Sequence, residues 1–263
     1  MIRRRDLFWG LFLLPMTAFD AEAAQGAFDE LIGRYVIFGA DGVARVDYRG
    51  WKDTAADRAA LAGAINAFAR TPFAELGRAA QFAAWANLYN ALTVAVVLDH
   101  YPIASIREVK SRVAGIDLKA LIGPWREKRI EVAGRKLSLD DIENTIMRPT
   151  FKDPRVHYAL NCASVGCPDL RVWRAATLEA DLDAAARAYV NHPRGIALTA
   201  RGLRLSSIFD WYADDFGGRD QGVRTHLASY ARPAIAEALR SRPIDGYDYD
   251  WSLNDAADPK GRP

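Results

Sequence analysis

The sequence predicts an α+β fold: a single compact domain of several helices packed with short antiparallel β-hairpins. Long segments carry apolar residues at helical spacing, and two short segments alternate around a glycine turn. The helices and hairpins do not follow one another as regular β-α-β units, which favours α+β over a doubly wound sheet. With 263 residues, half of them apolar, the chain is long enough for one large core.

Two helices are predicted in the first half of the chain. Over residues 54–70, apolar side chains recur at helical spacing, and a proline follows. A longer helix is expected over residues 77–100, closed by Pro102. Asn87 and Asn90 lie near the middle of this apolar helix. Because a buried amide must find hydrogen-bond partners, we expect both side chains to be committed structurally or chemically.

The rest of the chain mixes hairpins and helices. A β-hairpin is expected over residues 128–137, with its turn at Ala133 and Gly134, and a second hairpin over residues 195–206. A short strand is expected over residues 156–160. Further helices are expected over residues 138–148, 178–190, 207–216 and 223–240. No linker divides the chain after the N-terminal segment, so one domain is expected over residues 24–263.

The first 23 residues have the pattern of a cleavable twin-arginine signal peptide. Residues 3–5 are arginines, and the apolar stretch that follows is too short to span a membrane as a helix. Ala21 and Ala23 predict cleavage after Ala23. We therefore expect the twin-arginine export machinery and signal peptidase as partners. The mature protein should be soluble and periplasmic, without stable membrane insertion.

Composition argues against several classes of function. The chain has 35 basic and 33 acidic residues and a net charge of +2, without a basic stripe interleaved with aromatic residues, so nucleic-acid binding is not expected. No apolar stretch after the signal is expected to span a membrane. The usual nucleotide-binding, metalloprotease and serine-hydrolase motifs are missing from the sequence, so no cofactor is expected.

Residues that could carry chemistry concentrate in residues 154–168, which include His157, Asn161, Cys162 and Cys167. Three interpretations compete. Cys162 could be a thiolate nucleophile, the two cysteines could form a disulfide, or the two cysteines and His157 could bind a metal ion such as zinc. An oxidising periplasm allows the disulfide. Metal binding has the weakest support, because the thiols do not form a Cys-x-x-Cys pair.

A nucleophilic Cys162 requires a base. His157 is the nearest histidine in the sequence, but five residues along a regular strand place the two side chains on opposite faces. His157 can therefore act on Cys162 only if a turn intervenes. His100, at the end of the predicted long helix, is the other candidate, whereas His192 and His226 have the pattern of surface histidines.

Two further features have a structural interpretation that is favoured over a chemical one. Asp210, Asp214 and Asp215 lie at helical spacing and could perform acid–base chemistry or bind a cation, but a solvated helix face is the commoner arrangement. The tryptophans after the signal are scattered through the chain, as expected for core or capping residues.

Several separate motifs resemble, in the same order, the domain of unknown function 547 family. They occupy residues 85–94, 100–102, 137–143, 151–157, 161–168, 205–212 and 249–254. The resemblance extends from about residue 28 to residue 254, and it includes the positions of His157, Cys162 and Cys167. It implies no reaction, because the family has no assigned activity.

The chain also departs from the family pattern. Members often carry a histidine where Ala95 and Asn144 stand here. If one of those histidines were the catalytic base, this chain would lack it, which argues against thiol catalysis or passes the role to His157. Family domains also occur beside a glutaredoxin-like domain in larger eukaryotic proteins, an analogy that hints at thiol chemistry.

Two hypotheses of different class follow. In the first, the protein is a thiol-dependent hydrolase or acyl/amide transferase acting on a small-molecule or peptide substrate. Cys162 is its nucleophile, His157 its base, Asn161 or Asn87 an orienting or oxyanion-binding amide, and Asn90 a support. In the second, it is a non-enzymatic periplasmic binding or structural protein, and a Cys162–Cys167 disulfide fixes its binding surface.

Overall fold

The structure, a computed structural model, describes residues 18–113, 116–118 and 123–257. Within these ranges the chain forms ten α-helices, one π-helix and nine short strands, which confirms the predicted α+β class. The twin-arginine motif and most of the predicted signal peptide lie outside the described residues. Helix α1 (Ala18–Tyr35) runs across the predicted cleavage point, and Ala24 and Phe28 are among its buried residues.

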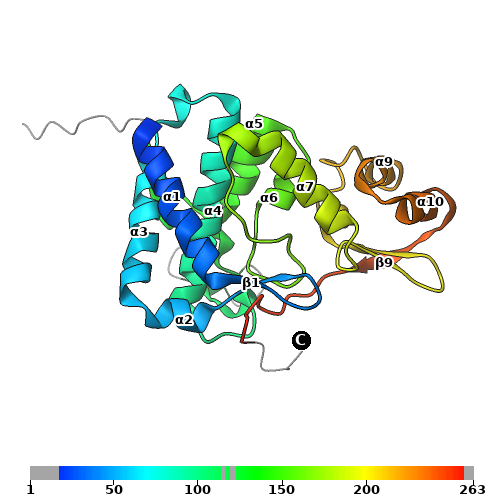
Figure 1. The fold of residues 1–263 in the computed structure, drawn as a ribbon, viewed down its shortest axis with the longest axis horizontal. Helices are drawn as coiled ribbons and strands as arrows, with labels where there is room; N and C mark the ends of the chain where they lie inside the picture. Colours follow the sequence, from blue (N-terminus) through cyan, green and yellow to red (C-terminus); the bar gives the residue numbers. More distant parts are fainter. Residues whose placement is uncertain (1–17, 114–115, 119–122, 258–263) are drawn as a thin grey trace, which may run out of the picture.

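The N-terminal half is a layer of helices that lie side by side at one end of the molecule (Figure 1). Besides α1, these helices are α2 (Tyr48–Asp53), α3 (Ala55–Ala69) and α4 (Arg78–His100). The predictions over residues 54–70 and 77–100 are confirmed. By length and composition α4 could cross a membrane, contrary to our expectation, but 89% of its apolar window is buried inside the protein. It is the core helix.

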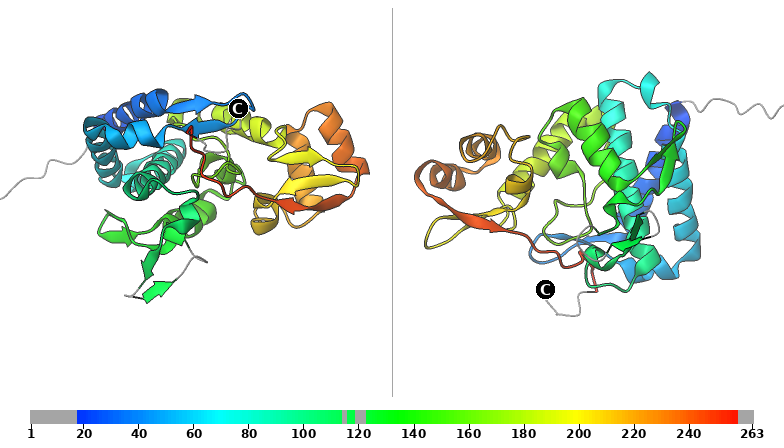
Figure 2. Two further views of the ribbon diagram at one scale, coloured as in Figure 1. Left: turned by 90° about the horizontal axis from the view of Figure 1, so that it is seen from below. Right: turned by 180° about the vertical axis from the view of Figure 1, so that it is seen from behind.

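The strands form four small sheets among the described residues. Three are antiparallel hairpins: β1 (Val36–Phe38) with β2 (Ala44–Val46), β3 (Ser111–Val113) with β4 (Ile116–Leu118), and β5 (Ile130–Val132) with β6 (Arg135–Leu137). The fourth joins β7 (Ile196–Leu198), β8 (Leu203–Ser206) and β9 (Ile244–Asp248). Figure 2 shows β3 to β6 projecting on one side of the molecule.

Both predicted hairpins are confirmed. In the first, Ala133 and Gly134 have φ angles of 48° and 76°, the left-handed conformation that a two-residue hairpin turn requires. In the second, β7 pairs with β8 around the turn at Gly202. The parallel pairing of β9 with β8 was not expected from the sequence. It brings the C-terminal end of the chain back into the domain.

The predicted strand over residues 156–160 is wrong. Val156–Ala159 is a short helix, α6, because the Asp153 carboxylate accepts the backbone N–H of Arg155 at 2.9 Å and turns the chain just before it. The predicted helix over residues 223–240 is two helices, α9 (Gln221–Tyr230) and α10 (Pro233–Ser241). They are separated where Pro233 starts a new helix, since proline cannot continue an existing one.

The other predicted helices are present with changed form or length. Helix α7 (Leu178–Val190) has the predicted bounds, and α8 (Ile208–Trp211) is shorter than expected. Most of the predicted helix over residues 138–148 is a π-helix, η4 (Asp141–Met147), which continues into α5 (Arg148–Phe151). The single-turn 3-10 helices are η1 (Phe73–Glu75), η2 (Ile106–Glu108), η3 (Gly123–Arg126) and η5 (Ala175–Thr177).

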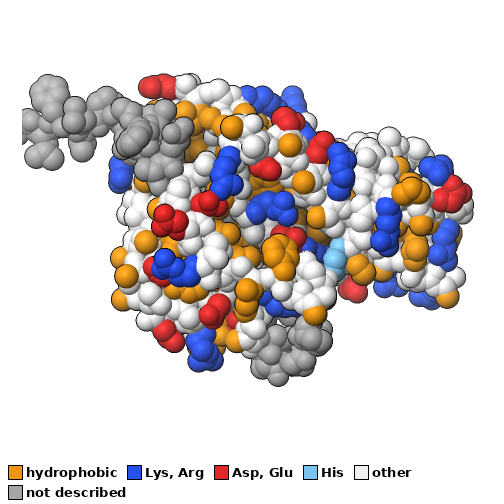
Figure 3. All heavy atoms as spheres, viewed as in Figure 1, with side chains coloured by type: hydrophobic (Ala, Val, Ile, Leu, Met, Phe, Trp, Pro, Cys, Tyr) orange, Lys and Arg blue, Asp and Glu red, His pale blue; other side chains and the backbone are white. Residues whose placement is uncertain are grey.

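Figure 3 shows basic and acidic side chains interspersed on one face.

The two asparagines of α4 join the core helix to a distant segment. Asn87 donates to the carbonyl of Trp173 and accepts its backbone N–H, both at 2.9 Å. Asn90 donates to the carbonyl of Ala159 at 3.0 Å and accepts the backbone N–H of Asn161 at 2.9 Å. Both amides are almost fully buried, which confirms that they are committed to partners.

We expect Asn90→Ala to lower the free energy of unfolding by about 2–4 kcal/mol, because it removes two buried hydrogen bonds and leaves two backbone groups without partners. Urea unfolding followed by circular dichroism measures the change. Asn66→Ala, an exposed position on α3, is the matched control and should change stability by about 0.5 kcal/mol or less. Equal losses in the two variants would contradict the role given to Asn90.

Candidate functional site

The chain between α6 and α7 contains a short loop closed by a disulfide, residues 160–168, which we call the disulfide loop. Cys162 and Cys167 are bridged, with their Cα atoms 6.3 Å apart. Inside the loop, Asn161 donates to the carbonyl of Pro168 at 2.7 Å and accepts the backbone N–H of Ala163 at 2.8 Å. The loop is therefore fixed by one covalent bond and by a buried amide.

The C-terminal segment packs against this loop. The backbone N–H of Val165 donates to Ser252, and that of Gly166 donates to Asp250. A Cβ atom on Gly166 would lie 3.0 Å from the backbone of Asp250, so this close approach favours glycine. The Tyr249 hydroxyl lies 3.1 Å from the sulfur of Cys162. Burial raises the pKa of Tyr249 well above its ordinary value, so this hydroxyl stays protonated.

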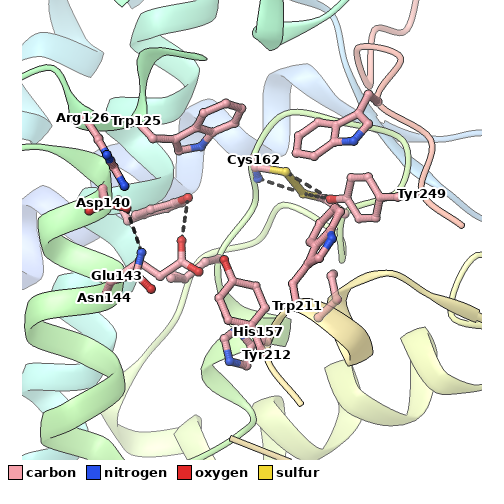
Figure 4. Close-up of a pocket in the computed structure, with 15 residues that line it drawn as sticks. Trp125, Arg126, Asp140, Glu143, Asn144, His157, Cys162, Trp211, Tyr212 and Tyr249 are labelled. Atoms are coloured by element: carbon pink, nitrogen blue, oxygen red, sulfur yellow. Dashed lines mark hydrogen bonds between the residues drawn. A yellow bond between two sulfur atoms is a disulfide. The ribbon is translucent and has the colours of Figure 1, made fainter. Parts of the chain in front are cut away.

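A cavity of about 370 Å³ opens beside the disulfide (Figure 4). Its lining comes from α4, η3, η4, α6, the disulfide loop, α8 and the chain after β9, segments that are far apart in the sequence. The lining residues are Tyr89, Trp125, Arg126, Asp140, Glu143, Asn144, His157, Leu160, Cys162, Cys167, Ile208, Trp211, Tyr212, Tyr249 and Trp251. We call this space the aromatic cavity.

Aromatic rings form one wall of the cavity. The ring of Trp251 lies 5.8 Å from that of Trp125 and 5.6 Å from that of Trp211, centroid to centroid. Tyr249 completes the group, with its ring 4.9 Å from Trp211 and 4.7 Å from Trp251. Trp211 is 48% exposed. An exposed tryptophan in contact with other rings is available to stack against a bound molecule.

Carboxylates lie on another side of the cavity. Glu143 projects from the π-helix η4, and Tyr89 donates its hydroxyl to the carboxylate at 3.2 Å. Burial of Tyr212, and after it the negative charge of the neighbouring Glu143 carboxylate, raises the pKa of the Tyr212 hydroxyl. Asp140 accepts the side-chain amide of Asn144 at 3.0 Å. π-helical turns occur frequently at functional sites, and here the extra residue per turn belongs to the segment that presents Glu143.

His157 also lines the cavity, but its hydrogen bond is directed to Asp215. Its Nε2 donates to the Asp215 carboxylate at 2.7 Å, and its ring stacks on Tyr212 with 4.0 Å between centroids. Arg148 donates to the same carboxylate at 2.5 Å. The hydrogen bond from His157, followed by that from Arg148, holds the pKa of Asp215 well below its ordinary value.

The structure brings together only part of the predicted catalytic set. Cys162 and His157 line the same cavity, but Figure 4 shows them well apart, and no hydrogen bond joins them among the described residues. Asn87, Asn90 and Asn161 lie behind the cavity wall, with their amides bonded to backbone. These three residues position the disulfide loop and do not line the cavity.

The other histidines lie outside the cavity lining. His100, the alternative base, is exposed at the end of α4. His226 is not the surface residue that its sequence context indicated. Its Nε2 and the hydroxyl of Tyr158 share a hydrogen bond of 2.9 Å, and burial lowers the pKa of His226 to about 4. In the part of the chain that the structure describes, no group of three or more histidine, cysteine, aspartate or glutamate side chains could hold a metal ion.

Several cavity residues were missed in the sequence. Trp51, Trp85 and Trp173 are buried as expected, but the remaining tryptophans of the described chain line the cavity. No local sequence signal separates the two groups, because Trp211 belongs to the short helix α8 and the buried Trp173 lies in a loop. Asp215, which we assigned to a solvated helix face, is bonded to His157.

Comparison with known proteins extends this description. Residues 73–190 match the family described as "Protein of unknown function, DUF547". The match confirms the resemblance for this segment. It includes Glu143, His157 and both cysteines, and it ends before the aromatic residues of α8 and of the chain after β9. No curated protein and no solved structure matches the chain.

Serine substitutions test whether the bridge supports the loop. Cys162→Ser and Cys167→Ser should each lower the free energy of unfolding by about 2–3 kcal/mol, since either removes the same cross-link. The double variant should lose about as much as one single variant, because the second substitution removes nothing further. Urea unfolding gives all three values. Additive losses would show that the two cysteines do not act as a pair.

Asp215 gives a pH-dependent test. The pKa of Asp215 is depressed in the folded protein. Its contribution to stability is therefore present at pH values above its pKa in the unfolded chain, about 3.9, and is lost as the pH falls toward its pKa in the folded protein. Asp215→Asn should therefore cost about 1–3 kcal/mol near neutral pH, and the difference from wild type should shrink in acid. Unfolding at a series of pH values measures both effects.

Asp214→Asn is the matched control, because this neighbouring carboxylate is exposed. We expect it to leave stability within about 0.5 kcal/mol of the wild type at every pH. A constant difference between Asp215→Asn and wild type down to acid pH would contradict the assigned role of the ionised carboxylate.

Proposed function

We propose that this protein is exported through the twin-arginine pathway and binds a small organic molecule in the aromatic cavity. The observation that carries the binding function is the cavity itself: about 370 Å³, with an aromatic wall and only a few polar groups. Small-molecule sites are typically concave spaces of this size and character. The export step rests on the sequence of residues 1–23, with its arginines, short apolar stretch and small residues before Ala24.

The cavity walls are held in place before any ligand binds. The disulfide and the Asn161 amide fix the loop from inside, and Asn87 and Asn90 bond its flanking backbone to the core helix. Such preorganisation lowers the entropy lost on binding and therefore favours affinity. The disulfide is then a structural support of a binding site, in agreement with the second hypothesis.

A thiol-dependent hydrolase or acyl/amide transferase is the second candidate function. It is favoured by the position of Cys162 in the cavity lining, 3.1 Å from the Tyr249 hydroxyl. In the bridged state Cys162 has no thiolate, so this function requires prior reduction by an external dithiol, which would itself become a disulfide. His157 would also have to turn from Asp215 toward the sulfur.

Alkylation separates the two candidates. The mature protein from periplasm is treated with iodoacetamide, with and without prior reduction, and its intact mass is measured. Two additions only after reduction support the bridged, ligand-binding form. Rapid addition at Cys162 without a reductant would overturn the proposed role of the bridge and favour the thiol enzyme.

Binding itself is tested by the thermal shift that a ligand causes. A panel of sugars, aromatic acids, amines and alkylammonium ions is screened against the wild type, Trp211→Ala and Phe38→Ala. At least one class should raise the Tm of the wild type. Trp211→Ala should remove at least half of that shift, because it deletes an exposed ring of the cavity wall.

Phe38 is 65% exposed on β1 and does not line the cavity, so Phe38→Ala controls for the loss of an exposed ring. It should respond to the ligand as the wild type does. If no class shifts the wild type, or if the shift is the same in both variants, the aromatic cavity is not a binding site.

A further inference from the structure

Glu143 is a buried acid in the wall of the aromatic cavity. Glu143 is 8% exposed, its carboxylate accepts the hydroxyl of Tyr89 at 3.2 Å, and the hydroxyl of Tyr212 also interacts with it. Both phenols are neutral, because the pKa of each is raised by burial. Among the described residues, no ion pair includes Glu143. Burying a carboxylate that forms no ion pair is costly, so its position in a cavity wall favours a positive charge supplied from outside the protein.

The nearby cations supply that charge only in part, since Arg148 interacts electrostatically with Glu143 but forms no ion pair with it. Arg148, which packs over the Tyr212 ring, forms an ion pair with Asp215 at 2.5 Å. Arg126 lines the cavity but is exposed to solvent. Two carboxylates, those of Asp140 and Glu143, face this single exposed guanidinium. Leaving His157 aside, the lining therefore carries one surplus negative charge.

The aromatic wall favours the same kind of ligand. The faces of tryptophan and tyrosine rings carry negative potential and attract ammonium groups, most strongly where water is excluded. Figure 4 shows the Glu143 carboxylate pointing into the space that Trp125 borders. A cation placed there can meet the carboxylate on one side and the rings on the other.

The arrangement fits a cation better than a sugar. A sugar needs several polar partners, donors as well as acceptors, around its hydroxyl groups. Here Asp140 and Asn144 are bonded to each other, and Tyr89 donates to Glu143. An anion would meet the surplus negative charge.

We propose that the aromatic cavity binds a compact organic cation, an alkylated ammonium ion, with its charge against Glu143 and its alkyl groups against the tryptophan rings. This inference rests on the proposed binding function and names the class of its ligand. The size of the cavity limits the cation to a small molecule or to the end group of a larger one.

The test compares choline with dimethylbutanol, its uncharged analogue in which carbon replaces the ammonium nitrogen, by isothermal titration of the mature, bridged protein. Choline should bind at least about tenfold more tightly than the analogue, a difference of about 1.4 kcal/mol that a desolvated cation–aromatic contact can supply. Glu143→Gln should reduce choline affinity by at least about tenfold and leave the analogue unchanged.

Glu131→Gln is the matched control, because Glu131 is exposed on β5 and does not line the cavity. It should bind choline as the wild type does. Circular dichroism of each variant confirms that it is folded before titration. Since glutamine keeps the size of glutamate, Glu143→Gln changes the charge and little else.

The outcomes are distinct. If the uncharged analogue or glucose binds as tightly as choline, the cation inference is overturned while the proposed binding function stands. If choline affinity survives in Glu143→Gln, the inference is again wrong. If none of these probes binds and the ligand panel shifts no melting temperature, the inference and the proposed function fail together.

Discussion

The site depends on a small set of buried hydrogen bonds between asparagine side chains and backbone. Asn87 and Asn90 project from the core helix. They bond to the backbone on both sides of the disulfide loop, at Ala159 and Trp173, and within it at Asn161. Each amide uses its donor and its acceptor, as a fully buried polar group must. The loop is thereby attached to the buried core helix α4, and the cavity wall keeps its shape without a ligand.

Two parts of the chain with different chemistry meet across the aromatic cavity. The π-helix η4 contributes the carboxylate of Glu143. Helix α8 contributes Trp211, and the segment after β9 contributes Tyr249 and Trp251. The parallel pairing of β9 with β8 makes this meeting geometrically feasible, because it directs the C-terminal chain back over the disulfide loop. The family match covers the acidic half and ends before this aromatic half.

The position of His157 in the sequence and its position in the structure indicate different roles. His157 stands five residues before Cys162, which made it the nearest base for a thiol. The helix α6 directs it instead to Asp215, and the cysteine is occupied by a disulfide. Short apolar runs are compatible with either a strand or a buried helix turn, and the choice between them decides which face a side chain occupies.

The sequence by itself determined the α+β class, the positions of α3, α4 and α7, both glycine-turn hairpins, and the commitment of Asn87 and Asn90. These features follow from local periodicity, turn chemistry and the need of buried amides for partners. Only the tertiary structure decided that Glu143 faces a wall of tryptophans, that Asp215 bonds to His157, and that Cys162 and Cys167 are bridged. These contacts join residues that are distant in sequence or lie in irregular turns, where no periodicity records which side chains will meet.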